Sequence, residues 1–282
     1  MEHATGAVIP TADAPWRSDL DSPADGDNGM SDDTDREASA SQRLARRTGL
    51  LYLAVAVFGM FAGTVSTNLV VPGDAGATAD KVVGSLGLLR GSLAAWIIVL
   101  AADVAVAVTL FILLRPTSAT LSLVAAAFRV VYAAVQGANL LNLFSALALL
   151  TGTTSGPVGA GQSSALALVF LDAFGTGFRL GLVFFGLHLV ALGWLLVASG
   201  YVPRAIGVLV VASGIAYATS SLAQLFLPGD SAAASAALLA FAAIGELALT
   251  AWLLVKGIKI HEGAASGAAS SARLAGATGG AR

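Results

Sequence analysis

Six stretches of this chain each hold about 20 consecutive, mostly apolar residues, enough to cross the ~30 Å hydrocarbon core of a bilayer as a helix rising ~1.5 Å per residue. Lipid offers no partner to a free backbone group, so such spans must be helices unless they close into a barrel. No alternating apolar pattern indicates a barrel. The sequence therefore predicts an all-α fold, a polytopic membrane bundle of six transmembrane helices. The predicted spans cover residues 49–71, 92–114, 120–150, 176–198, 205–227 and 232–255.

The composition agrees with a membrane protein and excludes several functional classes. Of the 282 residues, 56% are hydrophobic and 11% are charged, whereas a soluble domain carries about 25% charged residues. This balance excludes soluble enzymes and nucleic-acid binders. The chain has no cysteine, which excludes disulfides and thiolate metal sites. No set of His, Asp and Glu has zinc-ligand spacing, so we expect neither a metal nor a cofactor.

The two ends of the chain differ from the apolar body, residues 44–258. Residues 1–43 hold ten of the 17 acidic residues and show almost no aliphatic periodicity. Residues 259–282 are rich in Ala, Gly and Ser. Neither end can bury enough apolar area to offset the entropy of ordering it, so both are predicted to be disordered tails. Passive, solvated tails are the simpler interpretation, and recruitment of a partner is the alternative.

Basic residues flanking the spans predict the orientation of the bundle, because cytoplasmic loops carry an excess of Lys and Arg. Placing the N-terminus in the cytoplasm puts seven basic residues on inner flanks and two or three on outer ones. We therefore predict that both termini are cytoplasmic. An arginine-, alanine- and glycine-rich composition points to a bacterial cytoplasmic membrane. The inner residues are Arg43, Arg46, Arg47, Arg115, Arg204, Lys256 and Lys259, and the outer ones are Lys81 and Arg90, with Arg179 at the boundary.

Two segments do not fit a simple span and loop. Residues 162–198 are mostly apolar and as one helix would be longer than the hydrocarbon core is thick. We expect the part before Gly175 to project outward or to form a separate interfacial helix, with Gly175 and Gly177 as bend points. The connection over residues 72–91 contains enough apolar residues for an outer amphipathic helix.

Four ionisable residues are predicted to lie at one depth. Asp103, Arg129, His188 and Glu246 are each nine to eleven residues from the cytoplasmic end of their spans, or roughly 13–17 Å at ~1.5 Å per residue. An ionisable group at membrane depth is costly and is therefore usually paired or functional. If these four helices pack together, the sequence predicts a midplane polar cluster that stabilises helix packing or binds a small ligand.

Each member of this cluster also has a simpler interpretation. Arg129 can mark the cytoplasmic start of the third span and extend its guanidinium to the interface. Glu246 can hydrogen-bond a neighbouring helix as a neutral acid, and His188 can bond a carbonyl or a serine. A small-solute or proton-coupled transporter is the functional alternative. An intramembrane enzyme is disfavoured, because no G-x-S-x-G motif or recognisable set of catalytic residues occurs.

Three further charges are predicted at the outer boundary: Arg90, Asp172 and Arg179. Asp172 and Arg179 are seven residues apart and so share one helix face. A surface ion pair is the simpler interpretation, and an anion site formed by Arg179 with Arg90 is the alternative.

On the third span, amides at helical spacing predict interhelical hydrogen bonds. These side-chain amides belong to Gln136, Asn139 and Asn142.

Several ordered motifs resemble one bacterial membrane family. The strings are RTGLLYL at 47–53, VPGD at 71–74, GLVFFGLH at 181–188, SGYVPR at 199–204 and GELALTAWLL at 245–254. Together with Arg90, Asp103 and the Phe128-Arg129 pair, they resemble the six-span family catalogued as domain of unknown function 4386, over about residues 44–258. This resemblance implies a six-helix membrane bundle and implies no substrate, cofactor or activity.

The sequence thus predicts a non-enzymatic integral membrane protein whose partner is the lipid bilayer, joined by a small-molecule ligand if the polar cluster serves binding rather than packing. It predicts no nucleic-acid partner, and it carries no signal for an oligomeric state.

Overall fold

The computed structural model describes residues 26–153, 159–227 and 232–258, and over these ranges the chain forms seven helices and no strand. Residues up to Ala40 form one unit, which holds the first turns of α1, and Ser41–Arg282 form a second, which holds the bundle. The predicted C-terminal tail lies outside the described residues, whereas α1 begins within the segment predicted to be disordered. The helices are α1 (Gly26–Asn68), α2 (Ala75–Gly84), α3 (Leu86–Leu114), α4 (Ala119–Leu150), α5 (Ala160–Ser199), α6 (Arg204–Phe226) and α7 (Ala232–Val255).

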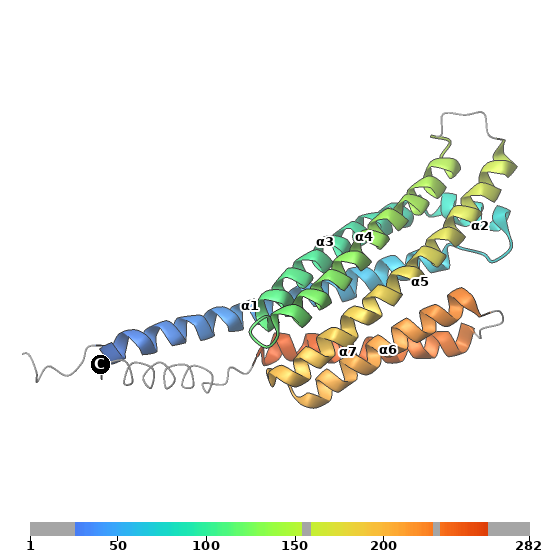
Figure 1. The fold of residues 1–282 in the computed structure, drawn as a ribbon. Coiled ribbons are helices and arrows are strands. Elements are labelled where there is room, and N and C mark those ends of the chain that lie inside the picture. Colours follow the sequence, from blue (N-terminus) through green and yellow to red (C-terminus); the bar gives the residue numbers. More distant parts are fainter. Residues whose placement is uncertain (1–25, 154–158, 228–231, 259–282) are drawn as a thin grey trace, which may run out of the picture. The chain divides into compact units, whose positions relative to one another are not determined.

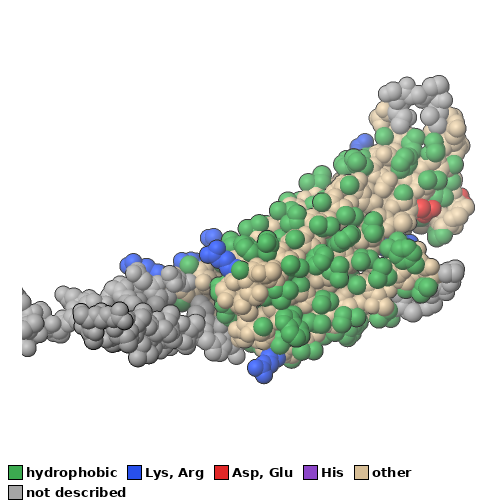
Figure 2. All heavy atoms as spheres, in the orientation of Figure 1, with side chains coloured by type: hydrophobic (Ala, Val, Ile, Leu, Met, Phe, Trp, Pro, Cys, Tyr) green, Lys and Arg blue, Asp and Glu red, His purple; other side chains and the backbone are tan. Residues whose placement is uncertain are grey.

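Every helix except α2 contains a segment long and apolar enough to cross a membrane, which confirms the all-α, six-span prediction. Large apolar side chains on these helices stay exposed, among them Met60, Trp194 and Val255, each more than 60% accessible. Hydrophobic side chains cover the visible face of the bundle, with Lys and Arg side chains at its margins (Figure 2). Such a surface suits lipid rather than water. The chain is a multi-pass membrane protein.

The spanning helices run in alternating directions and are joined by short connections with local stop signals (Figure 1). The Asp74 side chain caps α2 by accepting a hydrogen bond of 2.9 Å from the Ala77 N–H, so the predicted helix in the first connection is present. Ser118 caps α4 in the same way. Gly200 ends α5 with φ of 67°, a left-handed conformation that glycine adopts without strain.

The two ends of the bundle can be told apart by one polar contact. Gln42 near the start of the bundle donates to the Lys256 carbonyl oxygen at 2.8 Å and accepts from the Ile258 N–H at 3.1 Å. The part of α1 that enters the bundle and the end of α7 therefore lie side by side. We call this end of the bundle the terminal end. The opposite end, which holds α2, is called the loop end.

Helix α5 is continuous from Ala160 to Ser199, about 60 Å at ~1.5 Å per residue, so no separate helix precedes Gly175. The predicted break is wrong because Gly177 and Gly181 serve packing instead. A Cβ atom added at Gly181 would lie 3.1 Å from the Gln136 side chain of α4, and one at Gly177 would collide with Asn139. Helix α4 thus packs against the part of α5 that extends beyond a simple span.

Paired glycines bring α5 and α6 into close contact. A Cβ added to Gly214 of α6 would lie 2.6 Å from the Gly186 carbonyl oxygen of α5, and one added to Gly193 would lie 2.7 Å from that of Gly207. Small residues at such contacts let helix backbones approach one another, which is a main source of packing energy in lipid.

Gly214→Ala is expected to destabilise the bundle by about 1–3 kcal/mol, because the added methyl meets backbone that cannot move aside. Gly63→Ala is the matched control, since a Cβ there meets nothing within 4 Å. Alanine favours a helix over glycine by about 1 kcal/mol, so the control should keep or raise the melting temperature in detergent. Equal melting temperatures for the two variants would contradict the close α5–α6 contact.

Candidate functional site

Arg129 of α4 lies at the centre of a polar cluster inside the bundle. Its side chain is fully buried and forms an ion pair with the equally buried Asp103 of α3. Arg129 donates from Nε at 3.1 Å and from Nη2 at 2.5 Å, both to Oδ1 of Asp103. The alternative that Arg129 extends to the membrane interface is therefore wrong, because its charge is neutralised within the protein. Oδ2 of Asp103 is buried and has no hydrogen-bond partner among the described residues.

The remaining guanidinium nitrogen joins two further helices. Nη1 of Arg129 donates to the Tyr52 hydroxyl of α1 at 2.9 Å and contacts Nε2 of His188 of α5 at 3.0 Å. An arginine nitrogen can only donate, so Nε2 must accept and the imidazole proton must sit on Nδ1. Nδ1 in turn lies 2.8 Å from the Ala125 carbonyl oxygen, to which it donates. His188 is therefore a neutral imidazole with both nitrogens engaged.

Tyr52, Asp103, Arg129 and His188, here called the arginine cluster, tie four helices together. Aromatic rings complete its surroundings: the Arg129 guanidinium carbon lies 4.7 Å from the Tyr52 ring centroid and 5.3 Å from that of Phe185. At such distances the ring faces attract the cation, most strongly in a dry environment. The cluster is thus a hydrogen-bonded, charge-balanced unit inside the bundle.

The structure brings together three of the four residues predicted at one depth and places the fourth beside them. Glu246 of α7 makes no ion pair with Arg129; its carboxyl group contacts the Tyr217 hydroxyl of α6. Sequence reasoning missed Tyr52 and Tyr217. The available signal was the distribution of tyrosine, because three of the four tyrosines lie in the spans and all three reach this region.

Glu246 lies on the wall of a cavity of about 370 Å³ next to the arginine cluster. Most of the wall is aromatic or aliphatic, and Glu246 is the one carboxyl group among its residues, so we call it the aromatic cavity. It opens beside Met60 of α1 and Leu247 of α7, both of which are exposed. Its aromatic lining consists of Tyr52, Trp96, Tyr132, Phe178, Phe185 and Tyr217.

A second cavity of about 490 Å³, here called the loop-side cavity, extends toward the loop end. It includes Asp172, Arg179 and Gln224 in its lining. The two cavities have four lining residues in common, so they adjoin. Trp96 is one of these, and its buried indole N–H has no hydrogen-bond partner among the described residues. The shared residues are Trp96, Phe178, Leu182 and Leu239.

The three predicted boundary charges do not form one site. Arg179 donates to the Gly175 carbonyl oxygen at 3.2 Å, and no ion pair joins it to Asp172 in the described part of the chain. The expected surface ion pair is therefore wrong, although both side chains line the loop-side cavity. Arg90 is exposed and lines neither cavity.

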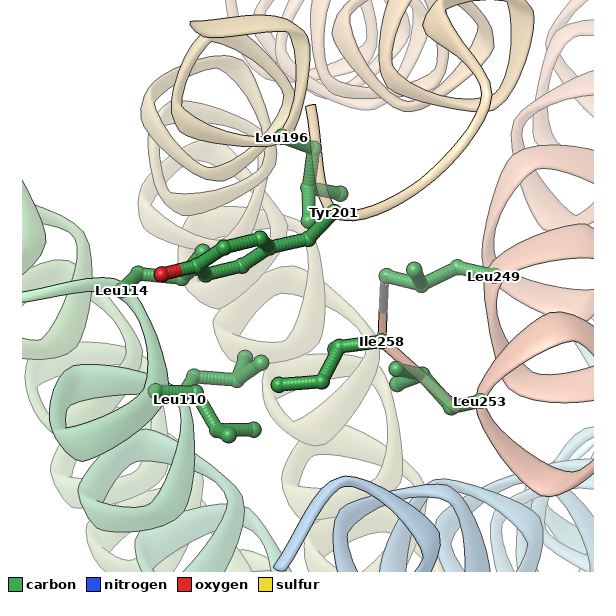
Figure 3. Close-up of a pocket in the computed structure, with 8 residues that line it drawn as sticks. Leu110, Leu114, Leu196, Tyr201, Leu249, Leu253 and Ile258 are labelled. Atoms are coloured by element: carbon green, nitrogen blue, oxygen red, sulfur yellow. The ribbon is translucent and has the colours of Figure 1, made fainter. Parts of the chain in front are cut away.

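At the terminal end, apolar side chains close the space between the helices. Tyr201, from the turn after α5, extends its ring toward Leu114, and Ile258 points between Leu110 and Leu253 (Figure 3). Only about 10 Å³ remains open among these side chains, about the volume that one water molecule needs. We call this group the apolar seal.

The amides predicted to bond between helices do so at one position. Asn139 donates to the Phe174 carbonyl oxygen of α5 at 2.9 Å, and Asn142 donates to the Asn139 side chain at 2.9 Å. Asn139 also donates to Gln136 at 3.3 Å. The bond to Phe174 joins α4 to α5 near the loop-side cavity, and the other two bonds lie within α4.

In the described ranges, no three His, Asp or Glu side chains lie close enough together to hold a metal ion. A family model described as "Domain of unknown function (DUF4386)" matches residues 47–257. No curated protein and no solved structure matches the chain.

Proposed function

We propose a function for this chain, which belongs to the family of domain of unknown function 4386, from the residues of its membrane interior. The arginine cluster stabilises the packing of α1, α3, α4 and α5, and the aromatic cavity beside it binds a small amphipathic molecule. The observation that carries this proposal is the position of Glu246, a carboxyl group on the wall of an otherwise mainly apolar cavity. Pockets of this composition and size are typical of small-molecule sites.

The arrangement of the polar groups supports separate roles, in which the arginine cluster stabilises helix packing and the aromatic cavity binds the ligand. Arg129 is hydrogen-bonded to both Asp103 and His188, and none of the three lines either cavity. Tyr52 belongs to both, because it accepts from Arg129 and also lines the aromatic cavity. Its own hydroxyl proton remains available for a ligand. We assign no catalytic step to His188, since both of its nitrogens are engaged.

Ligand binding can be tested through Trp96, which lines both cavities. We expect 8-bromooctan-1-ol, an amphiphile whose bromine quenches indole fluorescence, to quench the detergent-solubilised protein saturably. Trp96→Phe should remove the saturable component and leave the background from the other three tryptophans, Trp16, Trp194 and Trp252. Quenching that rises linearly, equally in both proteins, would indicate only partition into the micelle and would contradict the proposal.

We also propose that the protein resides in a bacterial cytoplasmic membrane with its terminal end in the cytoplasm. The charge distribution supports this orientation through the positive-inside rule. Arg115 follows α3 and Arg204 begins α6, and both belong to the turns at the end where Lys256 lies. A reporter that works only in the cytoplasm should therefore be active when fused after residue 282. A reporter that works only outside the cytoplasm should be inactive at the same position.

Transport of the bound molecule is a second candidate function. The observation that favours it is the asymmetry of the two ends: adjoining cavities extend toward the loop end, whereas the apolar seal closes the terminal end. Alternating access requires a second state in which that seal opens.

The chain lacks cysteine, so Leu110→Cys would place a unique thiol in the apolar seal. If the protein transports its ligand, an impermeant thiol reagent added from the terminal end should modify Cys at this position faster when octan-1-ol is present. This ligand carries no alkyl bromide that would itself alkylate the thiol. If the reagent fails to modify this cysteine both with and without the ligand, the result counts against transport. Ala205→Cys, at an exposed position of the same end, provides the fully reactive reference.

A further inference from the structure

We propose that the ligand of the aromatic cavity is a hydrophobic organic cation, an amine with an apolar body, and that Glu246 is its counter-ion. This inference rests on the proposed function, because it presupposes that the cavity binds a ligand. It adds the chemical class of that ligand and the residue that selects it.

The balance of charge around the cavity favours a cation. Asp103 and Arg129 form a neutral pair, and the hydrogen bonds of His188 require a neutral imidazole. Glu246 is the acidic residue on the wall of the aromatic cavity, and it contacts the hydroxyl of Tyr217 and forms no ion pair with a base among the described residues. Arg129 acts on it electrostatically, but the guanidinium of Arg129 is already paired with Asp103. A carboxylate inside a membrane protein is stabilised by a nearby positive charge, which a protonated amine would supply.

The shape and chemistry of the wall also suit a cation. Six aromatic residues line the same cavity as Glu246, among them Trp96, Phe178 and Tyr217. The face of an aromatic ring attracts an ammonium group within about 6 Å, and this attraction grows where water is excluded. An anion would meet the same faces with repulsion and would lie beside the Glu246 carboxylate.

The opening of the cavity indicates where such a molecule comes from. Met60 of α1 and Leu247 of α7 line the cavity and are 71% and 50% exposed, so the wall ends at the lipid-facing surface of the bundle. A molecule with an apolar body can enter sideways from the bilayer and keep that body among Val55, Val99 and Leu239 while its charged end reaches Glu246.

Three probes of equal length separate binding from charge selection: 8-bromooctylamine, 8-bromooctan-1-ol and 8-bromooctanoate. Saturable quenching of Trp96 in the full-length protein gives an affinity for each. We expect the amine to bind about tenfold more tightly than the alcohol, and the carboxylate to bind most weakly. Glu246→Gln keeps the size of the side chain and should bring amine and alcohol to within about twofold of one another.

Asp172→Asn is the matched control, because it removes a carboxyl group from the loop-side cavity and should leave the preference for the amine intact. Melting temperatures of both variants establish that they fold. If all three probes bind saturably with equal affinity, the cation proposal fails while the binding site stands. If none of them binds saturably, the proposed function itself fails. Loss of the preference in Asp172→Asn but not in Glu246→Gln would also overturn the assignment to Glu246.

Discussion

Arg129→Met is expected to destabilise the folded protein by about 3–5 kcal/mol, because it leaves the buried Asp103 carboxylate without its partner. The substitution keeps an unbranched side chain of similar reach, so the effect reports the lost charge rather than a large cavity. It also removes the hydrogen bonds to Tyr52 and His188. The measurement is the melting temperature of the purified protein in detergent, together with the yield of the monodisperse form.

Two further variants establish that the ion pair causes this loss. Arg115→Met removes an exposed arginine at the end of α3 and should change stability by no more than about 0.5 kcal/mol. Combining Asp103→Leu with Arg129→Met removes both charges, and replacing both partners of a buried pair by apolar groups is often nearly neutral. The double variant should therefore be more stable than Arg129→Met alone. A double variant that is less stable than either single variant would contradict the packing role of the pair.

Ala243→Phe is expected to weaken binding of 8-bromooctylamine by about tenfold or more. Ala243 lines the aromatic cavity from α7, one turn before Glu246, and a phenyl group at this position occupies the space that the ligand needs. Stability should be unchanged or slightly higher, because the new ring fills an existing cavity instead of displacing packed side chains.

Ala251→Phe is the matched control for this variant, since Ala251 lies on the same helix with its side chain exposed to lipid. Affinity for 8-bromooctylamine should remain at the level of the unmodified protein in this control. If Ala243→Phe binds the probe as tightly as Ala251→Phe does, the probe lies somewhere other than the aromatic cavity.

The fold follows almost entirely from local properties of the sequence. Length and apolar composition identify each span without any knowledge of its neighbours, so six spanning helices are predicted and found. Asp74 marks the start of α2 by its capping chemistry. The continuity of α5 does not follow from local properties of the sequence. Gly175 and Gly177 permit a bend, but Gly177 and Gly181 pack against α4 and keep the helix continuous.

The polar cluster is partly predictable, because the cost of burying a charge singles out its members. The cost of burying a charge and a shared depth in the membrane single out Asp103, Arg129 and His188. The structure brings Asp103 and His188 into direct contact with Arg129. Tyr52 escapes this argument, since an aromatic ring in an apolar span carries little cost of burial. Glu246 was identified by the same cost, but its place on a cavity wall depends on how α7 packs against α1, which no local pattern encodes.

The central claim is that the aromatic cavity holds a ligand whose cationic end lies at Glu246. Its most direct test is a structure determined with 8-bromooctylamine, in which the anomalous signal of bromine locates the probe. The account predicts one bromine position inside the cavity lined by Trp96 and Phe178, with the amine density at the Glu246 carboxyl group. Bromine found only on the lipid-facing surface of the bundle, with no density beside Glu246, would contradict it.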